Sequence, residues 1–136
     1  MWQIRVESTF SARHAIRYAS GEVEDPHDHT WHVEVRYAGA DLDDHGLLVD
    51  FVQAKHTLDS VLSKLAGTDL NTNPVLAGRN PTAEHVAGVI YAELQRAGSR
   101  ADNCVAVLVE EAPGCKACFI PDTNRRSPGR EADGGR

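Results

Sequence analysis

The clearest pattern in the chain is a strict alternation of apolar and polar side chains over residues 30–38. Tryptophan, valine and tyrosine stand at every second position of this run, and histidine, glutamate and arginine stand between them. A period of two is typical of an antiparallel strand with one buried face. Residues 2–10 alternate less regularly but are rich in β-forming residues, so they predict another strand.

Two segments in the middle of the chain carry the spacing of helices. The first extends from residue 51 to about residue 65, with Asp50 as its N-cap and Gly67 as its stop. The second begins after Thr82, whose hydroxyl is expected to cap it. Between them, residues 67–81 form a long irregular connector, and connectors of this length in compact domains often carry functional residues.

Two more strands complete the predicted order. Residues 103–109 are strongly apolar, and residues 116–120 follow them after a proline-glycine turn. The order strand, strand, helix, helix, strand, strand indicates one α+β domain over residues 1–122. The tail, residues 123–136, contains one alanine as its only apolar residue and is expected to be disordered.

Composition and charge narrow the classes of function. The chain has 136 residues, enough for one domain with a real core, and a formal net charge of -6. An acidic chain is not expected to bind a nucleic acid backbone, so a small-molecule substrate fits better. No apolar run approaches the ~20 residues of a membrane span, and the N-terminus does not resemble a signal peptide. Three cysteines do not make a disulfide framework, so we expect a cytoplasmic protein.

Three histidines are the main candidates for chemistry. His27 and His29 directly precede the alternating strand, and His14 follows the first strand. Residues two apart in a strand point to the same face, so His27 and His29 can reach one ion. Three imidazoles without a nearby cysteine are typical of a catalytic Zn²⁺ site with one open position. The alternative interpretation is that they are unrelated surface and turn histidines.

Six short motifs occur in order along the chain and extend these predictions. They are Phe10-Ser-Ala-Arg-His14, His27-Asp-His29, Gly46-Leu-Leu-Val-Asp50-Phe51, Leu70-Asn71, Asn80-Pro-Thr-Ala-Glu84 and Val109-Glu110-Glu111. With these motifs the chain resembles the 6-pyruvoyltetrahydropterin synthase and 6-carboxytetrahydropterin synthase family. The resemblance implies a tunnelling fold, ββααββ, in which a four-stranded antiparallel sheet carries two helices on one face. It also implies a homo-oligomer, a trimer or a hexamer, whose sheets form a barrel with active sites between subunits.

The resemblance also implies roles for individual residues. His14, His27 and His29 would hold Zn²⁺, and Glu111 would anchor a pterin ring by accepting two parallel hydrogen bonds from its guanidine-like edge. The residue after Glu111 is Ala112, where the family usually has threonine.

The proton relay of this chain departs from the family pattern. Val23 stands where the family usually has a cysteine, and Ala66-Gly67 stand where it has an aspartate-histidine pair. Glu24 is our first candidate for proton transfer, because a carboxylate beside a polarised group can act as general acid or base. A solvated loop carboxylate is the alternative for Glu24.

Further candidates come from residues close to the motifs. Asp69 and His85 are weaker candidates for the second member of a relay. Arg13 could meet a phosphate or carboxylate of the substrate, and Thr82 could contact the substrate besides capping its helix. Cys115 and Cys118 are interpreted as small packed side chains rather than as a metal or redox motif.

Three functions follow from this pattern. The first is a zinc-dependent synthase-like lyase acting on a small carbonyl-bearing or pterin-like molecule with a non-standard relay. The second is a cyclase of secondary metabolism that condenses an amine with an aldehyde or sugar phosphate, as in a Pictet-Spengler ring closure. The third is a catalytically silent assembly protein that keeps the fold and the metal.

Overall fold

The structure is a computed structural model, and it describes residues 1–98 and 100–122. The predicted order of elements is confirmed, and two short 3-10 helices are added to it. The elements are β1 (Trp2–His14), β2 (His27–Gly39), α1 (Phe51–Leu62), η1 (Pro74–Leu76), α2 (Ala83–Ala97), η2 (Ala101–Asn103), β3 (Cys104–Ala112) and β4 (Cys115–Phe119). The predicted disorder of residues 123–136 lies outside the described residues.

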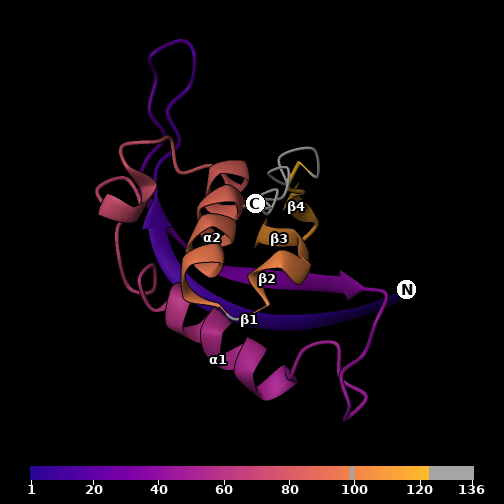
Figure 1. The fold of residues 1–136 in the computed structure, drawn as a ribbon. Helices are drawn as coiled ribbons and strands as arrows, with labels where there is room; N and C mark the ends of the chain where they lie inside the picture. The colour runs from indigo at the N-terminus through magenta and orange to yellow at the C-terminus, as the bar shows by residue number, and fades with distance from the viewer. Residues whose placement is uncertain (99, 123–136) are drawn as a thin grey trace, which may run out of the picture.

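The four strands form one sheet in the order β1-β2-β3-β4, and each neighbouring pair is antiparallel. β1 and β2 are long and curve together across the molecule (Figure 1). Helix α1 packs against β1, and α2 packs against β3 and β4, which confirms a ββααββ fold. Within the described residues, no helix is both long enough and apolar enough to cross a membrane.

The core lies between one face of the sheet and the two helices. The alternation in β2 places its odd-numbered side chains on this buried face and its polar side chains on the other, as the pattern predicted. Fully buried residues from the strands, the helices and the connector meet there. The largest of them include Trp31, Leu58, Leu62, Leu65, Leu70, Leu76 and Ile90.

The first two strands are longer than predicted. β1 continues past residue 10 to His14, and β2 begins already at His27. The connector supplies the extra hydrogen bonds along the outer edge of β1. Arg13 donates its N–H to the Thr68 carbonyl at 3.0 Å and accepts from the Leu70 N–H at 2.8 Å. The predicted strand ends were therefore wrong, because β1 and β2 go on pairing with each other as far as His14 and His27.

Both predicted helix caps are present. The Asp50 carboxylate accepts hydrogen bonds from two N–H groups of the first turn of α1, and the Thr82 hydroxyl accepts from the His85 N–H at the start of α2. α1 ends at Leu62, earlier than predicted, and the chain continues in tight turns to Gly67. Gly67 has a φ of 71°, a left-handed conformation that glycine adopts without strain, which explains the stop there.

A loop of residues 15–26, which we call the β1–β2 excursion, projects beyond the sheet in Figure 1. Its two arms pair with each other. Tyr18 donates its N–H to the Glu22 carbonyl at 2.8 Å, and Glu24 donates to the Ile16 carbonyl at 3.0 Å. This pairing returns the chain to the end of β1, so Glu24 lies close to His14 although ten residues separate them.

The three cysteines differ in their surroundings, which leads to a testable prediction. Cys104 is buried, and burial raises the pKa of its thiol to about 11, whereas Cys115 and Cys118 are exposed. A Cys115→Ser/Cys118→Ser double variant should therefore show no thiol reacting rapidly with Ellman's reagent at pH 8. Only the thiolate attacks the reagent, and the buried Cys104 thiol stays protonated at that pH. In denaturant, where Cys104 is exposed, one thiol should react. Rapid reaction of the folded double variant would contradict the burial of Cys104.

Candidate metal centre

Three histidines meet at one end of the β1–β2 pair. The strand register places His14 opposite His27 and Ala12 opposite His29, so all three imidazoles lie on the buried face of the sheet. The Nε2 atoms of His14 and His27 are 3.1 Å apart. The three rings stand nearly perpendicular to one another, at 71° to 89°. The structure thus brings together all three histidines that the sequence analysis selected.

Glu111 adds a carboxylate to this cluster from the end of β3. The register between β3 and β4 shifts between Glu110 and Ala112, which leaves Glu111 without a partner in β4. Its Oε1 lies 2.7 Å from His14 Nε2 and 3.4 Å from His29 Nε2. The four ligand atoms lie within 4.8 Å of one another.

The donor set and its geometry fit a four-coordinate divalent metal ion. Bonds of about 2.0–2.1 Å from a tetrahedral Zn²⁺ to nitrogen place neighbouring ligand atoms about 3.3 Å apart. Two separations, 3.1 Å between His14 and His27 and 3.4 Å between His29 and Glu111, match that value, and the 2.7 Å between His14 and Glu111 is shorter, a hydrogen-bond distance. Three nitrogens and one carboxylate oxygen are also ligands that zinc binds well.

Backbone carbonyls orient two of the imidazoles. The Nδ1 atoms of His14 and His27 lie 2.8 Å from the Pro81 carbonyl and 2.9 Å from the Asp25 carbonyl. If Nδ1 carries the proton and donates it, the Nε2 lone pair of each ring faces the cluster. Hydrogen bonds of this kind are typical of histidines that hold metals.

Burial favours the neutral, metal-binding form of the third imidazole, His29. Desolvation lowers the pKa of His29, and the neighbouring His27 lowers it further, while the Glu111 carboxylate opposes both effects. The neutral form of His29, which is the form that binds a metal, therefore persists to lower pH than in an isolated histidine.

Glu24 stands beside the cluster but outside ligand distance. Its Oε1 lies 3.7 Å from His27 Nε2 and 4.0 Å from His14 Nε2. The Ile16 N–H donates to this Oε1 at 2.8 Å, and the Tyr18 hydroxyl donates to Oε2 at 3.4 Å. The negative charge of Glu24 is the main cause that raises the pKa of Tyr18. The β1–β2 excursion thus holds a second carboxylate near the ligand atoms.

Two asparagines of the connector hold the chain that leaves His14. The Asn71 side chain accepts from the Ala15 N–H and donates to the Ala15 carbonyl, both at 2.8 Å. Asn80 makes the same pair of bonds with Arg17, both at 2.9 Å. The sequence analysis included both asparagines in motifs but assigned them no role, because their partners lie more than fifty residues away.

This arrangement predicts that Asn71→Ala destabilises the protein. The substitution removes two hydrogen bonds and leaves partly buried backbone groups unpaired, which should cost about 1–3 kcal/mol. Urea unfolding would measure the loss, with Gln53→Ala, a change of an exposed amide on α1, as control. Equal stability of the two variants would contradict a structural role for Asn71.

Four other predicted site residues, Arg13, Asp69, Thr82 and His85, contact groups other than the four ligand atoms. Arg13 lies on the opposite face of the sheet from His14, because neighbours in a strand alternate, and it pairs with Asp28 at 3.3 Å. Asp69 accepts a hydrogen bond from an N–H in its own turn. Thr82 caps α2, and the His85 ring contacts a connector carbonyl at 2.6 Å.

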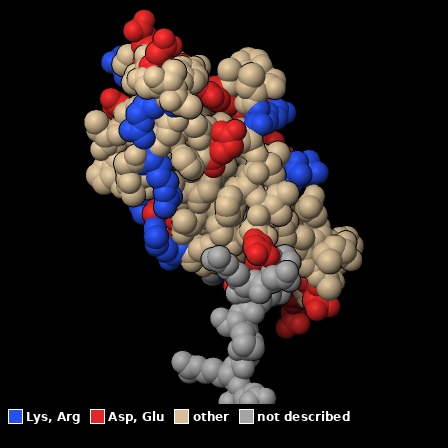
Figure 2. Space-filling model, turned by 90° about the horizontal axis from the view of Figure 1, so that it is seen from above, with Lys and Arg blue, Asp and Glu red and all other residues tan. Residues whose placement is uncertain are grey.

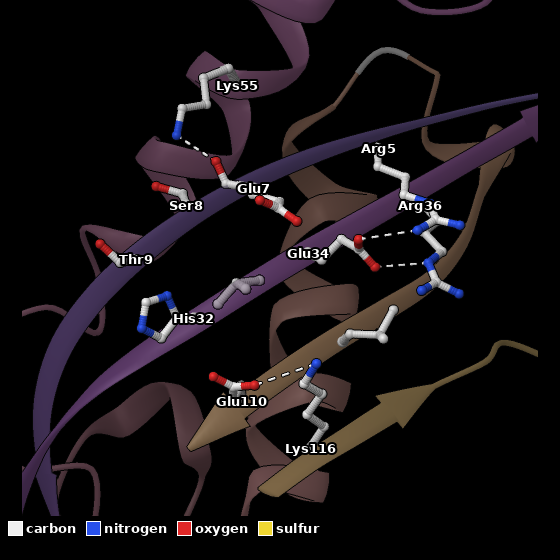
Figure 3. Close-up of a pocket in the computed structure, with 12 residues that line it drawn as sticks. Arg5, Glu7, Ser8, Thr9, His32, Glu34, Arg36, Lys55, Glu110 and Lys116 are labelled. Carbon is white, nitrogen blue, oxygen red and sulfur yellow. Dashed lines mark hydrogen bonds and ion pairs between the residues drawn. The ribbon is translucent and has the colours of Figure 1, made fainter. Parts of the chain in front are cut away.

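A hollow of about 640 Å³ lies on the polar face of the sheet, away from the histidine cluster (Figure 3). Its charged side chains mostly pair with one another. Glu34 contacts Arg36 at 2.8 Å and Arg5 at 3.6 Å, and Glu110 contacts Lys116 at 3.5 Å. Self-paired charges of this kind are typical of a solvated sheet face, so we place the candidate chemistry at the histidine cluster.

In the view from above in Figure 2, a line of lysine and arginine side chains runs down the left side of the molecule and others lie at the right. Aspartate and glutamate side chains occur at several separate places. The net charge of -6 is thus not gathered into one continuous acidic surface on this face.

Comparison with known proteins gives the same family as the six sequence motifs. The profile of the family described as "6-pyruvoyl tetrahydropterin synthase" matches residues 3–121. The 6-carboxy-5,6,7,8-tetrahydropterin synthase of Bacillus subtilis (strain 168) is 32% identical over 133 residues, covering 88% of this chain and 86% of the relative. The enzyme of the same name from Synechocystis is 30% identical over 112 residues, covering 79% of this chain and 86% of the relative.

Solved structures share the fold at lower sequence identity. The 6-pyruvoyl tetrahydropterin synthase of Caenorhabditis elegans superposes with a TM-score of 0.79 at 18% identity, covering 89% of this chain and 96% of that one. A Plasmodium vivax 6-pyruvoyltetrahydropterin synthase, in which a glutamate described as a catalytic residue is replaced by alanine, superposes with a TM-score of 0.74 at 17% identity. That match covers 89% of this chain and 98% of the other.

Proposed function

Because this chain belongs to the 6-pyruvoyl tetrahydropterin synthase family, we propose that it is a zinc-dependent lyase of the 6-carboxytetrahydropterin synthase type. Its substrate would be a pterin-like molecule, or another small molecule, with a carbonyl or hydroxyl group near the bond that breaks. The convergence of three imidazoles beside two carboxylates is the observation that carries this proposal.

His14, His27 and His29 would hold the zinc ion through their Nε2 atoms. When bound, zinc supplies Lewis acidity toward an oxygen of the substrate. The Pro81 and Asp25 carbonyls keep two of these ligand atoms directed at the centre. The chain itself therefore provides a preorganised site whose ligands need little rearrangement.

Glu24 would transfer the proton. A lyase of this kind must take a proton from a hydroxyl or carbon next to the polarised group, and Glu24 is the carboxylate nearest the centre that is held away from ligand distance. Val23, at the position of the family's usual cysteine, has no titratable group, which supports a non-standard relay.

Substrate binding would involve Glu111, whose two oxygens suit the guanidine-like edge of a pterin. Contacts of Arg13 and Thr82 with the substrate stay predictions, since the first pairs with Asp28 and the second caps α2. Asp69 and His85 stay predictions as relay members for the same reason: each is engaged by backbone groups.

We also propose a homo-oligomer, a trimer or a hexamer, with its active sites between subunits. β1 and β4 are the two edges of the sheet, and β1 is thirteen residues long. A long edge strand offers unpaired N–H and carbonyl groups to another strand, so pairing of β1 with β4 of a neighbour would close the sheets into a barrel. Light scattering should give a mass of three or six chains.

We place the protein in the cytoplasm, in keeping with its three free cysteines.

The test of the proposed reaction is incubation of the zinc-loaded protein with dihydroneopterin triphosphate. Chromatography should reveal a pterin that has lost or rearranged its side chain. Inertness of a protein that holds one equivalent of zinc would contradict the proposal. Such a result would favour the repurposed cyclase or the silent assembly protein instead.

Glu24→Gln tests the assigned base. It should lower kcat by about 10²- to 10⁴-fold, the usual contribution of a general acid or base. Zinc content should stay at one equivalent, because Glu24 lies outside ligand distance. Asp69→Asn is the matched control and should retain most of the activity. The opposite ranking of the two variants would place the proton transfer at Asp69.

A further inference from the structure

The two carboxylates at the centre are held differently. Glu24 is fixed by the Ile16 N–H and stays 3.7 Å or more from the imidazole nitrogens. Among the described residues, the contacts of the Glu111 carboxylate are with the imidazole nitrogens themselves, at 2.7 Å from His14 and 3.4 Å from His29. Glu111 therefore occupies the position of a fourth ligand, and Glu24 does not.

From this difference we infer that Glu111 is an exchangeable ligand. It closes the coordination of the metal while no substrate is bound, and it leaves when a substrate with a guanidine-like edge takes both of its oxygens. The inference rests on the proposed function, which supplies the metal and the substrate class. It adds a regulation of the site, in which a resting His₃Glu centre opens only for a ligand that captures Glu111.

The two tasks compete for the charge of one carboxylate. A bidentate contact with a guanidine-like edge uses both carboxylate oxygens in one plane, and Oε1 is the oxygen that lies among the imidazoles. Binding of such an edge therefore competes with the contact between Oε1 and the metal, both for the negative charge and for the direction of the carboxylate plane. In the resting state the negative charge of Glu111 offsets part of the charge of a divalent ion, which favours the closed form.

The position of Glu111 suits such a movement. It lies near the end of β3, where the register with β4 shifts, close to the Ala112–Cys115 end of the hairpin. Irregular strand ends of this kind re-aim side chains next to active sites. Its side chain is 25% exposed, so a ligand can reach it, whereas His14 is fully buried and fixed.

Cobalt substitution tests this inference without reference to turnover. Zinc is replaced by Co²⁺, whose visible absorption reports the number and kind of its ligands. Glu111→Gln should change the visible bands and weaken Co²⁺ binding by about 10- to 100-fold, in the range typical of losses near a metal site. Glu110→Gln is the matched control, because the Glu110 side chain pairs with Lys116 and lies on the other face of the sheet. It should leave both quantities unchanged.

Neopterin then tests the exchange. Its addition to the Co²⁺-loaded wild-type protein should shift the visible spectrum toward that of Glu111→Gln, and it should not shift the spectrum of that variant in the same way. Glu111→Asp provides a second variant with a shorter carboxylate, which should bind Co²⁺ with an altered spectrum, should Glu111→Gln fail to fold.

The outcomes separate this inference from the proposed function. Identical spectra and Co²⁺ affinities for the wild type and the Glu111 variants would overturn the role of Glu111 as a ligand while leaving the three-histidine centre intact. A wild-type spectrum that neopterin does not change would overturn the exchange. A wild-type protein that binds no Co²⁺ would refute the metal centre itself, and with it both proposals.

Discussion

His14→Ala is expected to abolish metal binding and activity together. His14 is fully buried, and its Nε2 lies 3.1 Å from His27 Nε2 and 2.7 Å from Glu111 Oε1, so it joins an imidazole and the carboxylate at the buried side of the cluster. Without it, two imidazoles and the Glu111 carboxylate remain around an emptied, buried position, so the ion loses one of its three nitrogen ligands. Zinc content should fall from one equivalent to nearly none. Turnover should fall by about 10³-fold or more, because Lewis-acid stabilisation is worth several kcal/mol.

The control for this prediction is His56→Ala, which removes an exposed imidazole from α1. It should retain one equivalent of zinc by elemental analysis and full turnover. Circular dichroism should first establish that both variants are folded, since His14 also engages the Pro81 carbonyl. A folded His14→Ala protein with undiminished zinc would refute the metal centre described above.

The alternation of apolar and polar residues was sufficient to predict β2 as a half-buried antiparallel strand. Side chains in β2 obey a period of two because one face meets the helices and the other meets solvent, and this is a local property of the sequence. The same periodicity placed His27 and His29 on one face. Pattern and family resemblance together thus led to the three histidines, and the register of His14 opposite His27 then follows from the antiparallel pairing.

What the sequence could not predict depends on contacts between distant segments. β1 extends to His14 because it pairs with β2 as far as His27 and because the connector also bonds to its outer edge at Arg13, and no local propensity of residues 11–14 encodes these pairings. The Asn71 and Asn80 side chains bond to the backbone just past the end of β1, at Ala15 and Arg17. Their partners are visible only once the chain has folded.

The places of Glu111 and Glu24 beside the imidazoles also depend on contacts between distant segments, so the sequence alone did not predict them. Glu111 was predicted as a substrate anchor from its motif, and its alternation with Val107 and Val109 indicates only that it shares their face. Its approach to His14 depends on the curvature of the sheet and the shifted register at the end of β3. Glu24 was selected because it neighbours the vacant cysteine position, but its place beside the ligands results from the pairing within the β1–β2 excursion.

Trp31→Ala is expected to cause the largest loss of stability, together with a loss of metal affinity. The Trp31 side chain is fully buried, stacks on Phe10 at a centroid distance of 5.8 Å and donates its indole N–H to the Ala12 carbonyl at 3.3 Å. Replacing a buried aromatic residue by alanine costs about 3–5 kcal/mol. That is a large share of the about 5–15 kcal/mol by which domains are stable.

Trp31→Ala should also weaken zinc binding, because the indole contacts the rings of His14 and His29 edge to face, at centroid distances of 4.9 and 6.0 Å. A cavity there would let both imidazoles turn, so zinc affinity should fall by about 10- to 100-fold, as for other supports of metal ligands. Urea unfolding with a chelator present measures the packing loss alone, and zinc titration of the folded variant measures the second effect. Trp2→Ala is the matched control: Trp2 is 55% exposed, and its loss should change stability by no more than about 0.5 kcal/mol. If the two tryptophan variants were equally stable, or if Trp31→Ala bound zinc as tightly as the wild type, Trp31 would not be the support that orders this centre.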